Sequence, residues 1–169
     1  MEYALRAIEI IVSEMGEYLE GSENAAASVL LAANLAGKAI NITQTTAAHA
    51  MCYKLTTLYG LPHGHSVALC LPHLWRYMLG HMEDCTDQRG EAFLQTVFEK
   101  IAAALGCGEI IQAIVKLEKM LEALEIKPPK QSQRDVELLT RAVNPIRMRN
   151  NQVHLDARES RKLNLDILK

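Results

Sequence analysis

The sequence predicts an all-α fold of seven or eight helices over residues 1–169, read as a single domain. Apolar residues recur three or four positions apart along almost the whole chain, which is the spacing of one helix face. The sequence has no clean run of alternating apolar and polar residues of the kind that predicts strands. The periodic segments also end at glycine or proline, which commonly terminate helices.

The first two predicted helices lie in the N-terminal part of the chain. Apolar residues from Leu5 to Leu19 form one stripe, which predicts an amphipathic helix. The next segment, from about Asn24 to Ala36, is rich in alanine and leucine. Gly37 follows it, so we expect the second helix to end there.

The third and fourth helices surround a short glycine- and proline-containing loop. Thr45 or Thr46 can cap the third helix, which should run to Tyr59 and stop at Gly60. The fourth begins near Pro62. We expect it to break or kink at Pro72, because proline removes a backbone hydrogen bond and clashes with the preceding turn.

Two further helices follow at the middle of the chain. Asp87 is a candidate cap for a helix that ends at Gly106, and residues 108–124 repeat the helical spacing. Neither segment contains a nucleotide-binding motif, because Ile111 replaces the third glycine of G-x-G-x-x-G and a helix precedes it.

The C-terminal part predicts a loop and two last helices. The loop contains Pro128 and Pro129, which cannot continue a helix. A helix should cover about Asp135 to Ala142, before Asn144 and Pro145. The last helix opens with the capping-box spacing of Asp156 and Glu159 and runs toward Leu168.

The composition excludes several classes of protein. The net charge of −2 argues against nucleic-acid binding, which usually needs a basic surface. We see no apolar run close to the ~20 residues that cross a bilayer. Glu2 and Glu9 lie where a signal peptide would be basic and then apolar. We therefore expect a cytoplasmic protein that binds neither nucleic acid nor membrane.

The four cysteines suggest no metal or redox motif. They are Cys52, Cys70, Cys85 and Cys107, and no C-x-x-C pair occurs among them. In a reducing compartment we expect all four to be buried thiols without a chemical role.

Histidines cluster around the third and fourth helices, where five of the six lie between positions 49 and 81. His49 lies in an apolar stretch and shares a helix face with Tyr53. His63 starts the next helix after a short loop, so the two histidines can converge on one metal ion. Taken singly, His49 could be a hydrogen-bonded core histidine and His63 a loop residue.

The other histidines are weaker candidates. His65 diverges from its neighbour two positions away on a helix, so the two should not chelate one ion. We expect His73 and His81 to be surface residues and His154 to be structural. Two histidines make half a site, because catalytic metal centres usually have three protein ligands.

These residues resemble a known family. The segment "GKAINITQTTAAHAMCYKLTTLYGLPHGHSVALCLP" is similar to the central motif region of the iron-containing (group III) alcohol dehydrogenases, in which a P-H-G histidine follows a helical H-A histidine by fourteen residues. His49 and His63 occupy those positions. Residues 147–153 resemble the family's R-x-x-N-N-P-V, with Gln152 in place of proline. The phosphonoacetaldehyde reductase branch looks most alike.

The resemblance implies a fold and a chemistry. The chain would be the helical C-terminal, metal-binding domain of an enzyme that interconverts an alcohol and an aldehyde by metal-assisted hydride transfer. His49 and His63 would ligate Fe²⁺ or Zn²⁺. Tyr53 replaces a further family histidine and would line the substrate pocket. NAD(P) would bind an N-terminal α/β domain, which we expect upstream of Met1 together with the D-x-x-x-H ligand helix.

Two partners are therefore expected for this chain. One is a nucleotide-binding N-terminal half, without which the isolated chain should be inactive. The other is a second copy, because apolar surface that faces a missing domain favours self-association. The alternative function is a non-enzymatic helical module for oligomerisation or scaffolding.

Overall fold

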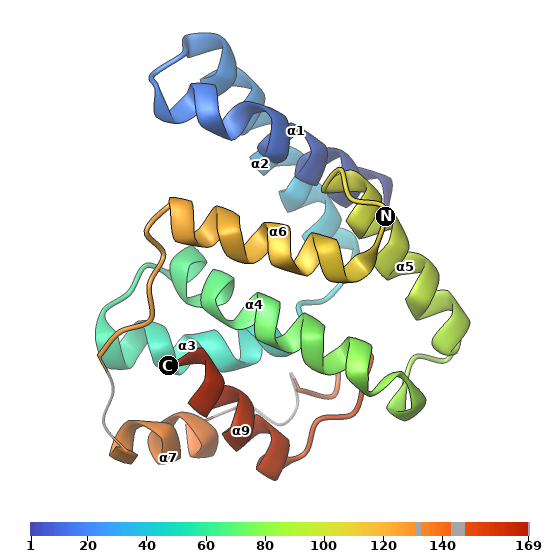
Figure 1. Ribbon diagram of the computed structural model, residues 1–169, viewed down its shortest axis with the longest axis vertical. Coiled ribbons are helices and arrows are strands. Elements are labelled where there is room, and N and C mark those ends of the chain that lie inside the picture. Colours follow the sequence, from blue (N-terminus) through green and yellow to red (C-terminus); the bar gives the residue numbers. More distant parts are fainter. Residues whose placement is uncertain (131–132, 143–147, 169) are drawn as a thin grey trace. The chain divides into compact units, whose positions relative to one another are not determined.

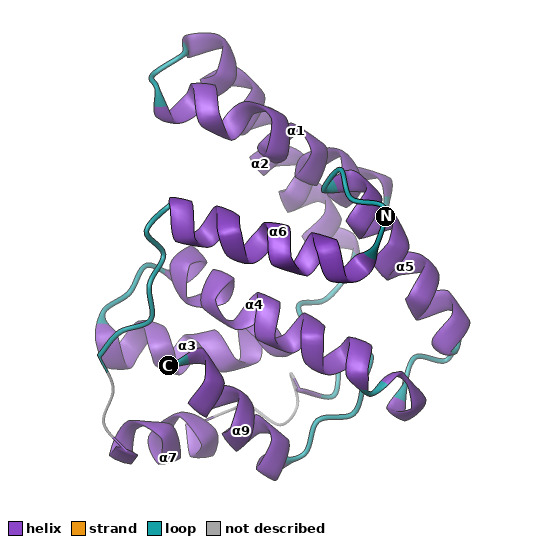
Figure 2. Cartoon of the chain, in the orientation of Figure 1, coloured by secondary structure: helices purple, strands orange, loops and turns teal. Residues whose placement is uncertain are grey.

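The computed structural model describes residues 1–130, 133–142 and 148–168. These residues form eight α-helices and one short 3₁₀-helix, and no strand occurs among them (Figure 2). The prediction of an all-α fold of seven or eight helices is confirmed. Asn144, Pro145 and Arg147, which entered the sequence predictions, lie outside the described residues.

The α-helices differ in length from ten to twenty residues. In chain order (Figure 1) they are α1 (Glu2–Leu19), α2 (Glu23–Ile42), α3 (Ala47–Tyr59), α4 (His63–Gly80), η1 (Met82–Asp84), α5 (Glu91–Ala104), α6 (Ile110–Ala123), α7 (Gln133–Ala142) and α9 (Ala157–Ile167).

The chain divides into two compact units. The first comprises residues 1–44 and 95–113, in which α1 and α2 pack side by side. Ala7 and Ile10 of α1 and Ala32 of α2 form a buried apolar cluster between the two helices. Small side chains at such a contact let two helix backbones approach closely. The prediction that residues 1–169 form one metal-binding domain stays a prediction.

The second unit comprises residues 45–94 and 114–169. Helix α3 packs on α4 and α7, and α9 packs on α4 and α7. The core between them contains Met51 and Leu55 of α3, Leu74 of α4, Leu139 of α7 and Ile167 of α9, all at most 2% exposed. Helices α7 and α9 therefore support α3 and α4 from the buried side.

Two segments that are far apart in the sequence are joined in this second unit, and we call the pair the 84–86/151–154 clip. Cys85 and Val153 form an isolated antiparallel bridge. Beside it, Thr86 N–H donates to Gln152 O over 2.8 Å and His154 N–H donates to Asp84 O over 3.0 Å. The clip fixes the end of α4 to the segment that precedes α9.

Several predicted helix ends are confirmed. Thr46 is the N-cap of α3, although its side chain makes no capping hydrogen bond, and Gly60 ends α3 in the left-handed conformation with φ +67°. Asp156 and Glu159 form a complete capping box at α9. These signals act within one helical turn, so the local sequence determines them.

Three predicted helix boundaries were wrong. Helix α2 continues through Gly37 to Ile42, because one glycine costs a helix only about 1 kcal/mol. Helix α4 runs unbroken through Pro72, which is buried among core residues whose packing opposes the cost of about 3 kcal/mol. Helix α5 begins at Glu91, because the carboxylate of Asp87 instead accepts from Arg89 N–H in the preceding turn.

The cysteine prediction is correct for only two of the four thiols. Cys52 and Cys70 are buried, whereas Cys85 and Cys107 are half-buried. Cys85 lies in the clip, and Cys107 follows Gly106 in the turn after α5.

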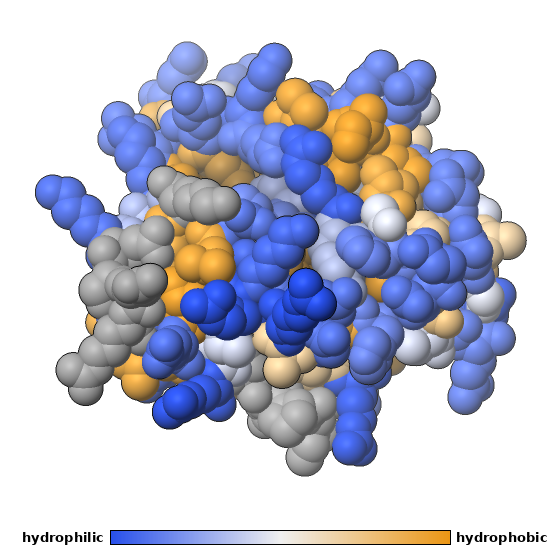
Figure 3. All heavy atoms as spheres, turned by 60° about the horizontal axis from the view of Figure 1, so that its bottom comes forward, coloured by the Kyte–Doolittle hydropathy of each residue, from blue (hydrophilic) through white to orange (hydrophobic). Residues whose placement is uncertain are grey.

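Helix α2 also corrects the expectation about apolar runs. Within the described part of the chain it is the one helix that is long and apolar enough, by length and composition, to cross a membrane. Helices of soluble proteins pass the same test, and the expectation that the chain binds no membrane stays a prediction. Apolar side chains also reach the surface among hydrophilic ones on the face drawn in Figure 3.

Candidate metal centre

The loop between α3 and α4 brings His49 and His63 together. Gly60 reverses the chain in a conformation that other residues rarely adopt, and Pro62 precedes the first residue of α4. The two imidazole rings lie 5.4 Å apart between centroids, tilted by 54°. Two imidazoles on one tetrahedral ion have ring centres about 5 Å apart, given metal–nitrogen distances of about 2.0–2.1 Å. The two rings are therefore neighbours in the fold, and their convergence on one metal ion stays a prediction.

The two histidines differ in exposure. His49 is half-buried in α3 with the buried Ala48 and Ala50 on either side of it in the chain, whereas His63 is exposed at the N-terminus of α4. One side of the pair is thus anchored in the core and the other is open to solvent.

Tyr53 lies one helical turn after His49 and is a neighbour of the histidine pair. Its ring centroid is 5.6 Å from that of His63, and 44% of the residue is exposed. A phenol at the open side of the pair is suitably placed for a pocket wall. The role of Tyr53 in a substrate pocket stays a prediction.

A third side chain beside the pair was not anticipated. Cys52 is completely buried in α3, and its Sγ lies 3.7 Å from Nδ1 of His63. The same Sγ lies 3.3 Å from the backbone oxygen of His49, to which it donates. The i, i+3 spacing of His49 and Cys52 was visible in the sequence, but the contact with His63 depends on how α3 and α4 cross.

The described residues do not complete a metal site. No group of three or more His, Cys, Asp or Glu side chains is placed to hold a metal ion within residues 1–130, 133–142 and 148–168. Neutral imidazole nitrogens are suitable ligands for both Fe²⁺ and Zn²⁺. The role of the pair as metal ligands stays a prediction, and an ion held by it would need further ligands.

The remaining histidines do not join the pair. His65 Nε2 contacts the backbone oxygen of Lys127 at 3.1 Å, so it points away from His63 as predicted. His81 is half-buried, stacks on Tyr77 with a 4.2 Å centroid distance and contacts Tyr77 O through Nδ1 at 2.8 Å. This corrects the expectation of a solvated histidine, because the turn after α4 folds back on its own helix.

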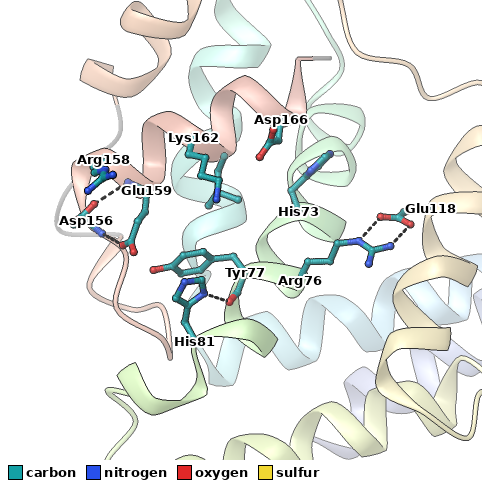
Figure 4. A pocket seen from close by; sticks show the side chains of 11 residues that line it. His73, Arg76, Tyr77, His81, Glu118, Asp156, Arg158, Glu159, Lys162 and Asp166 are labelled. Atoms are coloured by element: carbon teal, nitrogen blue, oxygen red, sulfur yellow. Dashed lines mark hydrogen bonds and ion pairs between the residues drawn. The ribbon is translucent and has the colours of Figure 1, made fainter.

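A separate cavity of about 680 Å³ lies along the second half of α4 (Figure 4). Residues of α4, α6 and α9 line it, among them His73, Lys162 and Arg76. Arg76 makes a two-pronged ion pair with Glu118, with hydrogen bonds of 2.9 and 2.6 Å. Neither His49 nor His63 lines this cavity, so it is distinct from the predicted site.

The chain is similar to a family of known proteins. The Fe-containing alcohol dehydrogenase family, C-terminal, matches residues 2–136. A phosphonoacetaldehyde reductase of Streptomyces viridochromogenes is 32% identical over 133 residues, which are 76% of this chain and 33% of the reductase. A 1,3-propanediol dehydrogenase of Klebsiella pneumoniae is 38% identical over 82 residues, 45% of this chain and 20% of that enzyme. The chain thus spans about a third or less of these relatives.

Solved structures show the same fold. An iron-containing alcohol dehydrogenase from Thermococcus thioreducens matches 99% of this chain and 43% of its own with a TM-score of 0.82 at 22% identity. One from Thermotoga maritima matches with a TM-score of 0.75 at 23% identity. Because the match covers residues 2–136, the chain belongs to the Fe-containing alcohol dehydrogenase family and represents the C-terminal helical part of it.

Proposed function

We propose that this chain is the metal-ligating helical part of an NAD(P)-dependent oxidoreductase that interconverts an alcohol and an aldehyde. The convergence of His49 and His63 at the α3–α4 corner is the observation that supports it most directly. The family membership and the reductase and dehydrogenase names of its relatives support the reaction class.

In this proposal the two histidines are neutral ligands of a divalent cation, Fe²⁺ or Zn²⁺. Such a cation would act as a Lewis acid on a carbonyl oxygen. His49 would bind the cation from the buried side. His63 would bind it from the exposed side, at the loop between α3 and α4. Tyr53 borders the open side and would restrict which substrates can approach.

The cofactor and the reaction belong to the whole enzyme. We propose that NAD(P) binds a nucleotide-binding part, because the chain spans 33% of the reductase that it resembles. The isolated chain should therefore show no turnover with aldehydes and NADPH. Activity that appears only on addition of a nucleotide-binding half would support the proposal, and turnover by the chain alone would contradict the assignment of the cofactor to another part.

Metal titration tests the ligand pair. Zn²⁺ and, without oxygen, Fe²⁺ are titrated calorimetrically into the metal-free chain. The His49→Ala/His63→Ala double variant should lose one-to-one binding. The matched control is His65→Ala/His154→Ala, which removes two histidines outside the pair and should bind as the wild type does. Binding that is measurable in the wild type and equal in both double variants would contradict the proposal.

A second function is favoured by one observation. Helix α2 exposes large apolar residues, with Leu30 72% and Ile42 74% exposed. An exposed apolar helix of this kind can bury itself against another subunit. We infer as the alternative a non-enzymatic oligomerisation or scaffold module, for which metal-independent self-association through α2 would be the main evidence.

A further inference from the structure

The buried sulfur of Cys52 connects the two candidate ligands. It lies in α3, three residues after His49 and under the first residue of α4. Its Sγ approaches the backbone oxygen of His49 to 3.3 Å and the Nδ1 atom of His63 to 3.7 Å. Both distances fall within the reach of hydrogen bonds to sulfur, which is larger than oxygen.

The number of available protons decides which group donates and which accepts in these two contacts. A thiol carries one proton, and a backbone carbonyl oxygen can only accept. The contact between Cys52 Sγ and His49 O therefore uses the thiol proton. The contact with His63 Nδ1 then needs its proton on nitrogen, with the sulfur as a weak acceptor.

Burial strengthens this assignment. Cys52 is 0% exposed, so water does not replace either contact at the sulfur. A buried polar group left without a partner costs free energy, which favours the arrangement that satisfies both contacts. In a neutral imidazole with its proton on Nδ1, the lone pair is on Nε2.

We propose that Cys52 is a positioning residue for His63: it holds the imidazole as the Nδ1–H tautomer and leaves Nε2 able to bind a metal ion. The inference rests on the proposed function of His63 as a ligand. Metal-binding histidines commonly donate their second N–H to a carboxylate, carbonyl or water. Here a thiol sulfur takes that place, and the partner comes from the helix that carries the other ligand.

The tautomer can be read directly from the metal-free chain. Long-range ¹H–¹⁵N correlation spectra of the ¹⁵N-labelled protein distinguish a protonated from an unprotonated ring nitrogen. They are recorded near pH 8, above the ordinary histidine pKa of about 6.5. The His63→Gln variant assigns the signals. We expect wild-type His63 to be protonated at Nδ1; protonation at Nε2 in the wild type would overturn the inference without any cysteine variant.

Three variants separate positioning from packing. Cys52→Ala should shift His63 toward the Nε2–H tautomer, and Cys52→Ser should restore Nδ1–H through its hydroxyl oxygen. The matched control is Cys70→Ala, which removes another completely buried thiol of the same core and should leave the His63 tautomer unchanged. A tautomer that is the same in Cys52→Ala and the wild type would contradict the inference.

Zn²⁺ titration distinguishes this inference from the proposed function. Cys52→Ala should raise the Zn²⁺ dissociation constant about 10-fold or more, as loss of outer partners of metal ligands typically does, and Cys70→Ala should not. If Zn²⁺ binding is insensitive to the His49→Ala/His63→Ala change, the proposed function fails and the tautomer result stands by itself. If binding needs the pair but His63 carries its proton on Nε2, the inference fails and the proposed function stands.

Discussion

The hydroxyl of Tyr59 donates a 3.0 Å hydrogen bond to Oδ2 of Asp135, which joins the last residue of α3 to the first turn of α7. Partial burial, together with the bond to the carboxylate and its negative charge, raises the pKa of Tyr59 to about 12. The two residues are 76 positions apart in the sequence, so the bond joins α3 and α7, two helices of the same core.

This bond predicts a loss of stability at high pH. Between the ordinary tyrosine pKa of about 10 and the folded value, the folded protein retains a proton that the unfolded chain releases. The stabilisation is therefore complete below pH 10 and is lost as pH rises through about 12. Tyr59→Phe should lower the free energy of unfolding by about 1 kcal/mol at neutral pH and flatten its fall above pH 10. Urea unfolding at several pH values measures both effects, and parallel curves for the two proteins would refute the assignment.

The N-cap side chains of α9 and α3 should contribute differently to the free energy of unfolding. Asp156 accepts from Glu159 N–H over 2.8 Å and belongs to a complete capping box. Asp156→Ala should cost about 1 kcal/mol of unfolding free energy. Thr46→Ala is the control, because the Thr46 side chain makes no capping bond, and should cost much less. Thermal unfolding compares them; equal losses would mean that cap position, and not the hydrogen bond, determines the cost.

Two glycines should respond to alanine in opposite directions. Gly60 has φ +67°, where a Cβ atom is strained, so Gly60→Ala should destabilise the chain by about 1 kcal/mol or more. Gly37 lies within α2 with open space where a Cβ would stand, so Gly37→Ala should stabilise it by up to about 1 kcal/mol. Unfolding midpoints measured by circular dichroism test the pair. A stabilising effect at Gly60 would contradict the left-handed helix end.

Self-association should depend on the exposed side of α2. Leu30 and Ile40 are 72% and 54% exposed, so replacing both with glutamate should leave folding intact and reduce the sedimentation coefficient of the associated chain. Leu71→Glu on α4 is the control, because Leu71 is an exposed apolar residue of another helix. A wild-type chain that sediments as a monomer at the highest attainable concentration would refute the prediction and the alternative function with it.

Features with a local cause could be predicted from the sequence. The left-handed end of α3 at Gly60 and the capping box of Asp156 and Glu159 each involve residues of one turn. The course of α4 through Pro72 could not be predicted in this way. Its cause is the packing of the helix against α3 and α9, and that packing depends on residues far away in the sequence.

The same distinction separates the parts of the candidate site. The approach of His49 and His63 follows from a short loop between two helices, so the motif spacing was sufficient to predict it. The contact of Cys52 with His63 needs the crossing angle of α3 and α4 and the rotamers of both side chains. A cysteine among apolar neighbours gives no sign of such a contact, which is why the sequence suggested no role for it.

The 84–86/151–154 clip has a consequence for the order of folding. Its bond from Thr86 Oγ1 to Asn151 O spans 65 positions, whereas the contact of Cys52 with His63 spans 11. Closing the longer loop costs about 1.6 kcal/mol more chain entropy. We therefore expect the α3–α4 hairpin to form early in the folding reaction and the clip to close late. A chain caught before that last step should already hold the rings of its two histidines next to each other.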